Sequence, residues 1–192
     1  MDDENTQVLN FSAKMISDYP EDRRRQFVVS YYLCDKTMAV FEMQVPNSGF
    51  RAGKFLQRTR VRDPKTKQFF EPSAFYVGAK IHVSGRVFEL LDAAPHTLCL
   101  MEAHSDEFPE ADISTVIANL MNACQQTTKS IRSLFEERDT RKTGFVTVDE
   151  AKSIFSQFVP QITPHAVLTL VRAFEKDNGT YEYNLLLNYM RA

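Results

Sequence analysis

Residues Asp139 to Glu150, with the sequence DTRKTGFVTVDE, have the length and the end residues of a calcium-binding loop. Such a loop takes a carboxylate at its first position, a glycine at the sixth where the chain turns sharply, and a two-oxygen glutamate at the twelfth. Asp139, Gly144 and Glu150 stand at these positions. The remaining oxygen ligands would come from Thr143, Phe145 and Thr147. Calcium is therefore the only cofactor that these residues suggest, and we expect no other.

Two cations weaken this loop as a calcium site. Arg141 stands at the third position, where an oxygen ligand belongs, and Lys142 follows it. A second loop, FEKDNGTYEYNL from Phe174 to Leu185, has no carboxylate at its first or last position and carries Lys176 at its third. We therefore expect low calcium affinity at the first loop, and a helical module held together by packing. A calcium-responsive regulator is the alternative interpretation.

The segments around both loops have the apolar spacing of helices. Ile113, Val116, Ile117 and Leu120 recur at steps of three and four, which is typical of one buried helix face. A second helix is expected around Leu134. A third is expected to begin at a capping box of Thr147 and Glu150, a fourth at Thr163-Pro164, and a fifth to carry Leu185, Leu186 and Tyr189. Helix, loop and helix, repeated once, resembles a paired EF-hand, so residues 112–192 are predicted to form an all-helical EF-hand-like pair.

A basic run lies in the other half of the chain. Seven cations fall within 17 residues, with Asp63 as the only acid among them: Arg51, Lys54, Arg58, Arg60, Arg62, Lys65 and Lys67. Most runs of this kind are solvated loops. The functional interpretation is a contact for an acidic partner, because clustered Lys and Arg raise association rates and fix orientation. Residues 8–104 hold 14 basic against 10 acidic residues and residues 105–192 hold 9 against 12, so the two halves differ in sign.

Extended patterns precede the helices. In RQFVVSYYLCDKTMAVFE, residues 25–42, alternate side chains are apolar on either side of a polar turn, which predicts a hairpin. Ser84-Gly85 is predicted to turn a second hairpin. Further strands are expected at residues 8–15 and 97–102. Several short strands at this spacing favour an antiparallel barrel or sandwich, and the fold class is then α+β.

The same residues resemble a known module. YYL, the D-x-T turn, VFE, the N-S-G turn and GKFL, followed by residues 75–102, are similar to the DM-ten (DM10) domain, which occurs in ciliary and flagellar proteins such as the EF-hand-containing C family and the protofilament-ribbon proteins of axonemes. The resemblance implies a pleckstrin-homology-like barrel. It also implies a structural microtubule inner protein of doublet microtubules, with acidic tubulin and neighbouring inner proteins as partners. On this basis we expect the protein to be located in the cytoskeleton of the ciliary or flagellar axoneme.

Other chemistries are disfavoured. Gly49 to Lys54 has three residues between its glycines where a phosphate loop requires four, and Phe55 stands where a magnesium-binding hydroxyl belongs. His96, Cys99 and His104 lack a fourth metal ligand nearby, and strand alternation would point the first two to opposite faces. No nucleophile motif is present. We therefore expect a non-enzymatic protein; because DM-ten domains also accompany a kinase, an enzyme-associated subunit ranks third.

Composition sets the remaining expectations. With 43% hydrophobic and 25% charged residues the chain is an ordinary globular protein, and three cysteines at unrelated spacings favour a reducing compartment. The polar start and the lack of a long apolar stretch predict a soluble protein of the cytoplasm, with no membrane or nucleic-acid partner. We divide the chain into a flexible tail at 1–7, a β domain at 8–104, a linker at 105–111 and the helical module at 112–192.

Overall fold

The computed structural model describes residues 7–126, 130–176 and 178–191. The chain forms two compact units, residues 1–108 and 109–192, and the division falls inside the segment predicted as a linker. Of the predicted tail, residues 1–6 lie outside the described part.

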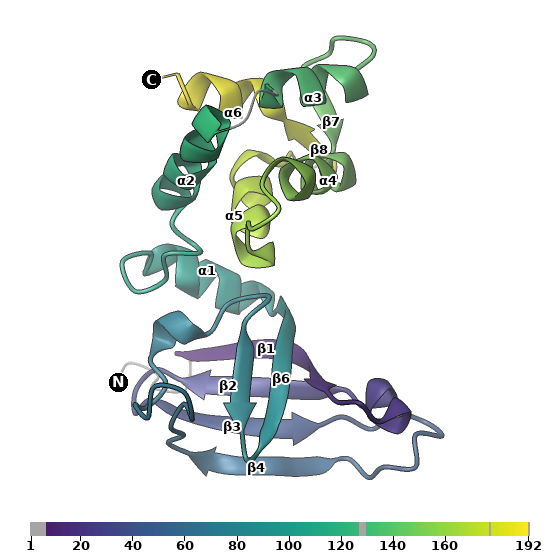
Figure 1. Ribbon diagram of the computed structural model, residues 1–192, viewed down its shortest axis with the longest axis vertical. Coiled ribbons are helices and arrows are strands. Elements are labelled where there is room, and N and C mark those ends of the chain that lie inside the picture. Colours follow the sequence, from purple (N-terminus) through teal and green to yellow (C-terminus); the bar gives the residue numbers. More distant parts are fainter. Residues whose placement is uncertain (1–6, 127–129, 177, 192) are drawn as a thin grey trace. The chain divides into compact units, whose positions relative to one another are not determined.

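The first unit is an antiparallel sheet in the order β4-β3-β2-β1-β6-β5 (Figure 1). Its strands are β1 (Val8–Ile16), β2 (Phe27–Tyr32), β3 (Thr37–Glu42), β4 (Gly53–Thr59), β5 (Lys80–Val83) and β6 (Arg86–Ala93), and the short 3-10 helices Pro20–Arg24 and Pro72–Ala74 lie between them. Both predicted hairpins, β2–β3 and β5–β6, are confirmed, as is the strand at the start of the chain. At the β5–β6 turn Ser84 and Gly85 both have positive φ, 50° and 74°. Glycine takes this conformation without strain.

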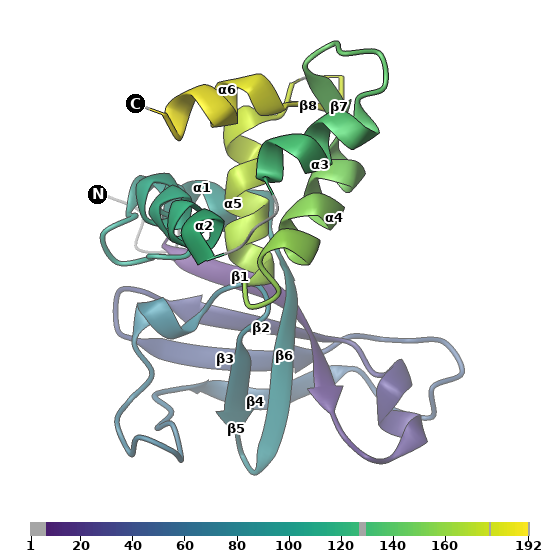
Figure 2. The same cartoon turned by 45° about the horizontal axis from the view of Figure 1, so that its top comes forward.

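Aromatic side chains curl the sheet into an open half-barrel. Phe27 of β2 meets Phe88 of β6 with ring centroids 5.0 Å apart. Phe55 of edge strand β4 also reaches Phe88, at 5.2 Å, although three strands separate β4 from β6 in the sheet order. In Figures 1 and 2 the β5–β6 hairpin accordingly crosses the face of β2, β3 and β4. Edge-to-face rings of this kind contribute about 0.5–1.5 kcal/mol per pair beyond area burial. The predicted α+β class is confirmed.

One predicted strand is wrong. Residues 97–102 belong to helix α1 (Pro95–Ala103), which follows β6 directly. Pro95 fits the first helical turn, and the buried side chains of Thr97, Leu98 and Met101 follow helical spacing. The threonine hydroxyl accepts a hydrogen bond from the backbone N–H of Asn10 at 2.9 Å, which fixes the start of α1 against β1.

The second unit contains five helices and one short two-stranded antiparallel sheet in its described residues. The helices are α2 (Ile113–Gln126), α3 (Ile131–Arg138), α4 (Val148–Phe158), α5 (Pro164–Phe174) and α6 (Tyr183–Tyr189); strands β7 (Phe145–Thr147) and β8 (Thr180–Glu182) pair between the two loops. The Thr147–Glu150 capping box of α4 and the Thr163 cap of α5 are confirmed. One apolar core unites these elements; its largest fully buried side chains are Phe135, Phe155 and Tyr181. Helix, loop and helix therefore occur twice, as the sequence predicts.

Candidate functional site

The loop between α3 and β7 is closed around the carboxylate of Asp139. Its Oδ1 accepts hydrogen bonds from the backbone N–H of Thr143 at 3.0 Å and the hydroxyl of Thr143 at 3.1 Å. Its Oδ2 accepts from the backbone N–H of Gly144 at 2.7 Å and the hydroxyl of Tyr183 at 2.9 Å. Asp139 is only 5% exposed. Four donors from this chain thus surround the carboxylate that a calcium ion would use first.

Tyr183 connects this loop to the second one. It begins α6, directly after β8, and is 4% exposed. Its ring stacks on Phe135 of α3, with centroids 5.0 Å apart and planes 7° apart. The stacking aims the hydroxyl at Asp139, which is 44 positions earlier in the sequence. The hydrogen bond therefore joins the two halves of the helical unit without a metal ion.

The electrostatics of the pair follow from this geometry. Desolvation by burial acts to raise the pKa of Asp139, but hydrogen bonds from Thr143, Gly144 and Tyr183 stabilise the ionised form and lower the pKa to about 2. Burial, followed by the hydrogen bond to the Asp139 carboxylate, raises the pKa of Tyr183 to about 12. At neutral pH the carboxylate is therefore ionised and the phenol carries its proton.

The other predicted calcium ligands serve the backbone. Glu150 Oε2 accepts hydrogen bonds from the N–H and the hydroxyl of Thr147, at 2.9 and 2.8 Å, and these bonds lower the pKa of Glu150. Phe145 lies in β7, and its backbone N–H donates a hydrogen bond to the Thr143 hydroxyl at 3.3 Å. In the second loop Lys176 pairs with Glu182 at 2.9 Å. Among the residues that the structure describes, no group of three or more His, Cys, Asp or Glu side chains could hold a metal ion.

All seven cations of the basic run are exposed: Arg51 precedes strand β4, Lys54 and Arg58 lie on it, and the other four follow it. Arg58 is already engaged: it pairs with Asp35 at 2.7 Å, donates to the hydroxyl of Thr37 at 2.9 Å, and lies 3.8 Å from the centre of the Tyr32 ring. The sequence gives no signal for this pairing, because Asp35 belongs to the preceding hairpin turn. Arg58 fixes the edge of the sheet as well as contributing charge.

The remaining cations divide into held and unpaired groups. The guanidinium groups of Arg60 and Arg62 both lie over the ring of Phe69, at 4.3 and 4.1 Å from its centre. Within residues 7–126, 130–176 and 178–191 no ion pair involves Arg51, Lys54, Lys65 or Lys67. Strand β4 is an edge strand, hydrogen-bonded only to β3, so this basic edge faces solvent.

His96, Cys99 and His104 do not form a site. The expected strand alternation was wrong here, because His96 and Cys99 lie on α1. His96 Nε2 lies 3.1 Å from the carbonyl oxygen of Val8, and His104 is the residue that ends the helix.

The helical unit contains a cavity of about 320 Å³, lined by residues of α2 and of the α4–α5 connection. Sequence patterns did not indicate it. No helix in the described ranges is long and apolar enough to cross a membrane.

Comparison with known protein families identifies the domain that forms the first unit. The family model of the DM10 domain matches residues 1–97. The chain belongs to the DM10 domain family. It is also 34% identical over 174 residues to EF-hand domain-containing family member C2 of Danio rerio, and 34% identical over 176 residues to the protein of the same name from Bos taurus; each alignment covers 87% of this chain. EF-hand domain-containing protein 1 of Homo sapiens is 39% identical over 109 residues, or 54% of this chain and 17% of that protein.

These matches bear on both units. An alignment of 174 residues is longer than the DM10 region, so the similarity to the C2 relatives continues into the helical unit. The chain spans about a quarter of the length of these relatives, 23% and 24%.

Proposed function

We propose that this chain is a structural, non-catalytic protein of ciliary and flagellar doublet microtubules, where it binds the tubulin lattice from the lumen and contacts neighbouring inner proteins. The membership in the DM10 family supports this role, together with the similarity to proteins named for EF-hand domains. The resemblance to the EF-hand-containing C family implies the axoneme as the location and acidic tubulin as the partner.

The single observation that carries the proposal is the exposed basic edge of β4. Lys54 lies on β4, Arg51 precedes it, and Lys65 and Lys67 lie in the turn between the bridged residues Arg62 and Phe69. These four exposed cations have no ion-pair partner in the described part of the chain. Pairing with β3 fixes the backbone of Lys54, which lowers the entropic cost of a contact between this edge and an acidic surface. They also steer the encounter electrostatically. We therefore assign the tubulin contact to this edge.

The geometry of the first loop favours a structural role over the calcium-responsive alternative. A switch requires an ion that binds one conformation much better than another. The Asp139 carboxylate already accepts four hydrogen bonds, and an ion would have to displace some of them and approach Arg141. In the second loop Lys176 is paired with Glu182. The helical unit is therefore proposed to pack as a constitutive module.

The test is incorporation into axonemes. Tagged protein in a ciliated cell should stay with the doublets after detergent and moderate salt, and a protein found wholly in the soluble fraction would sink the proposal. For the contact itself, Glu substitutions at the four unpaired cations should weaken binding to purified doublets by roughly tenfold, since each exposed charge contact contributes about 0.2–1 kcal/mol.

The matched control changes the net charge equally elsewhere on the same unit. Arg23, Arg24, Lys80 and Arg86 are exposed and lie outside the basic run, so replacing them with Glu should leave most of the binding intact. Equal losses in both variants would show that only net charge matters and would remove the assignment to β4. Coincident thermal melts of the variants and the parent protein establish that each is folded.

A further inference from the structure

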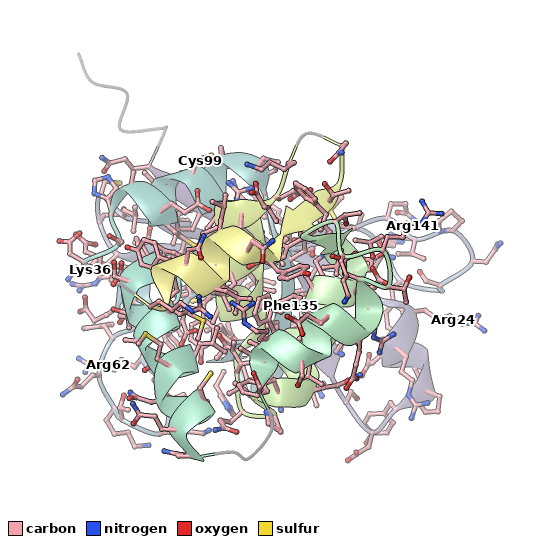
Figure 3. The ribbon with its side chains drawn as sticks, turned by 90° about the horizontal axis from the view of Figure 1, so that it is seen from above. Arg24, Lys36, Arg62, Cys99, Phe135 and Arg141 are labelled. Atoms are coloured by element: carbon pink, nitrogen blue, oxygen red, sulfur yellow. The ribbon has the colours of Figure 1, made fainter. Side chains whose placement is uncertain are left out.

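The first EF-hand-like loop presents positive charge to solvent, the opposite of a cation site. Asp139, the only acid between positions 138 and 148, is buried, whereas Arg138, Arg141 and Lys142 are exposed. Figure 1 shows this loop between α3 and β7 reaching beyond the helices, and Figure 3 shows Arg141 on its outside while Phe135 lies among the helices. Between positions 138 and 148 the negative charge is therefore inside and the positive charge outside.

The acids around the loop lie away from its tip: Asp149 and Glu150 stand in the first turn of α4, where Glu150 accepts the hydrogen bonds of Thr147. Arg132 of α3 pairs with Glu136 at 3.5 Å. Glu137 and Arg138 are adjacent in sequence and both exposed, so their charges largely offset each other at a distance. Arg141 and Lys142 remain, and they form the tip of the loop.

The tip is held in one conformation. The backbone N–H of Thr140 donates to the carbonyl of Arg138 at 3.1 Å, and that of Lys142 donates to the carbonyl of Asp139 at 3.0 Å. Lys142 has a φ of 54°, a left-handed conformation stabilised by these bonds and by the Asp139 carboxylate beneath. A pre-ordered backbone lowers the entropic cost of presenting two side chains to a partner.

We propose that this loop is a docking site for carboxylates on an acidic protein surface, with Arg141 and Lys142 as the contacting residues and the Asp139–Tyr183 hydrogen bond as the support that replaces a metal ion. Phe145, 38% exposed at the start of β7, adds an apolar contact beside the cations. The inference concerns only the helical unit. It does not rest on the proposed role of β4.

The charge of the surroundings favours protein over nucleic acid as the partner. Residues 105–192 carry 9 basic and 12 acidic residues, so this part of the chain as a whole repels a dense polyanion. A local cluster of two cations and one aromatic side chain is matched by a local cluster of carboxylates beside apolar surface. Nucleic acid binding, by contrast, grows with the number of phosphates neutralised.

An NMR titration can follow binding at the residues of the loop. A short synthetic peptide with a few glutamates beside apolar residues is titrated into the isotope-labelled full chain at low salt while the backbone amide resonances of residues 139–146 are followed by NMR. We expect saturable shifts at Arg141 and Lys142 that vanish as salt screens the contact. Replacing both residues with Gln should weaken the loop's apparent affinity about fivefold, as expected for two exposed charge pairs.

The control is Lys152→Gln on α4, an exposed lysine of the same unit, which should leave the loop shifts unchanged. Unshifted loop resonances, or equal losses from Lys152→Gln, overturn the proposal. Stronger loop shifts with single-stranded RNA at matched charge would assign the site to nucleic acid instead, and saturable loop shifts with calcium would restore the cation site. Because the probe contains no tubulin, failure to bind doublets leaves this result unaffected.

Discussion

Replacing Tyr183 with Phe removes one hydroxyl and nothing else from the centre of the helical unit. The stacked ring contact with Phe135 remains, because Phe has the same ring. What is lost is the 2.9 Å hydrogen bond to Asp139 Oδ2, and the carboxylate keeps its donors from Thr143 and Gly144. The substitution therefore measures how much the hydroxyl stabilises the closed loop.

The magnitude follows from the type of bond. A hydrogen bond to a charged group contributes about 1.5–3 kcal/mol to stability. Because Asp139 keeps its other donors, we expect a loss near the lower end, about 1.5 kcal/mol. For a cooperative unit of this size such a loss lowers the melting temperature by about 6–12 °C, from about 4–8 °C per kcal/mol. Calorimetry and urea unfolding of the full chain would measure it.

Tyr181 provides the opposite case in the same core. Its hydroxyl is buried and has no hydrogen-bond partner among the described residues, and burial raises its pKa. Tyr181→Phe should therefore be neutral or stabilising by about 1 kcal/mol, because an unsatisfied buried hydroxyl is removed. If the Tyr183 variant melts with the parent protein, or if both variants lose stability equally, the hydroxyl of Tyr183 is not what fixes the loop.

Two further predictions concern charge. The folded-state pKa of Asp139, about 2, lies below the unfolded value near 3.9, so its stabilising effect is present above about pH 4 and is lost as pH falls through about 2; the urea midpoint of Asp139→Asn should therefore fall less between pH 5 and 2 than that of the parent chain. Arg25 donates from Nε and Nη2 to the two oxygens of Glu42, at 2.7 and 2.8 Å, and from Nη1 to Asp22 at 2.8 Å. Arg25→Lys should lower the free energy of unfolding in urea by about 1–3 kcal/mol, since Lys keeps the charge but cannot bind both carboxylates at once. An unchanged urea midpoint would show that these hydrogen bonds do not stabilise the first unit.

Local signals predicted most of the elements correctly. The turn at Ser84-Gly85, the capping box at Thr147 and the proline after Thr163 each specify a boundary through backbone chemistry within a few residues. The segment 97–102 misled because a short apolar run reads equally as strand or helix. Tertiary contacts decide between them, here the bond between Thr97 and Asn10 across 87 positions.

The partners of charged residues were not predictable. The sequence indicates that Arg58 is a cation in a basic run, but its salt bridge to Asp35 depends on the pairing of β4 with β3. Residue types alone therefore overstated the free charge of this edge. Arg51, Lys54, Lys65 and Lys67 are the members that the fold leaves for a partner, and a test by charge reversal belongs there.

In the first loop the carboxylate of Asp139 has a different role from the one it would have in a calcium site. A calcium loop collects carboxylates around an ion, whereas this loop spends its one deeply placed carboxylate on Thr143, Gly144 and Tyr183. Once Asp139 is satisfied from within, the third loop position no longer needs an oxygen, and Arg141 is tolerated there with its charge in solvent. The hydrogen bonds that satisfy Asp139 thus leave the loop tip able to carry cations. We therefore expect a loop held by protein donors to keep its shape with and without calcium, which suits a permanent structural contact better than a signal.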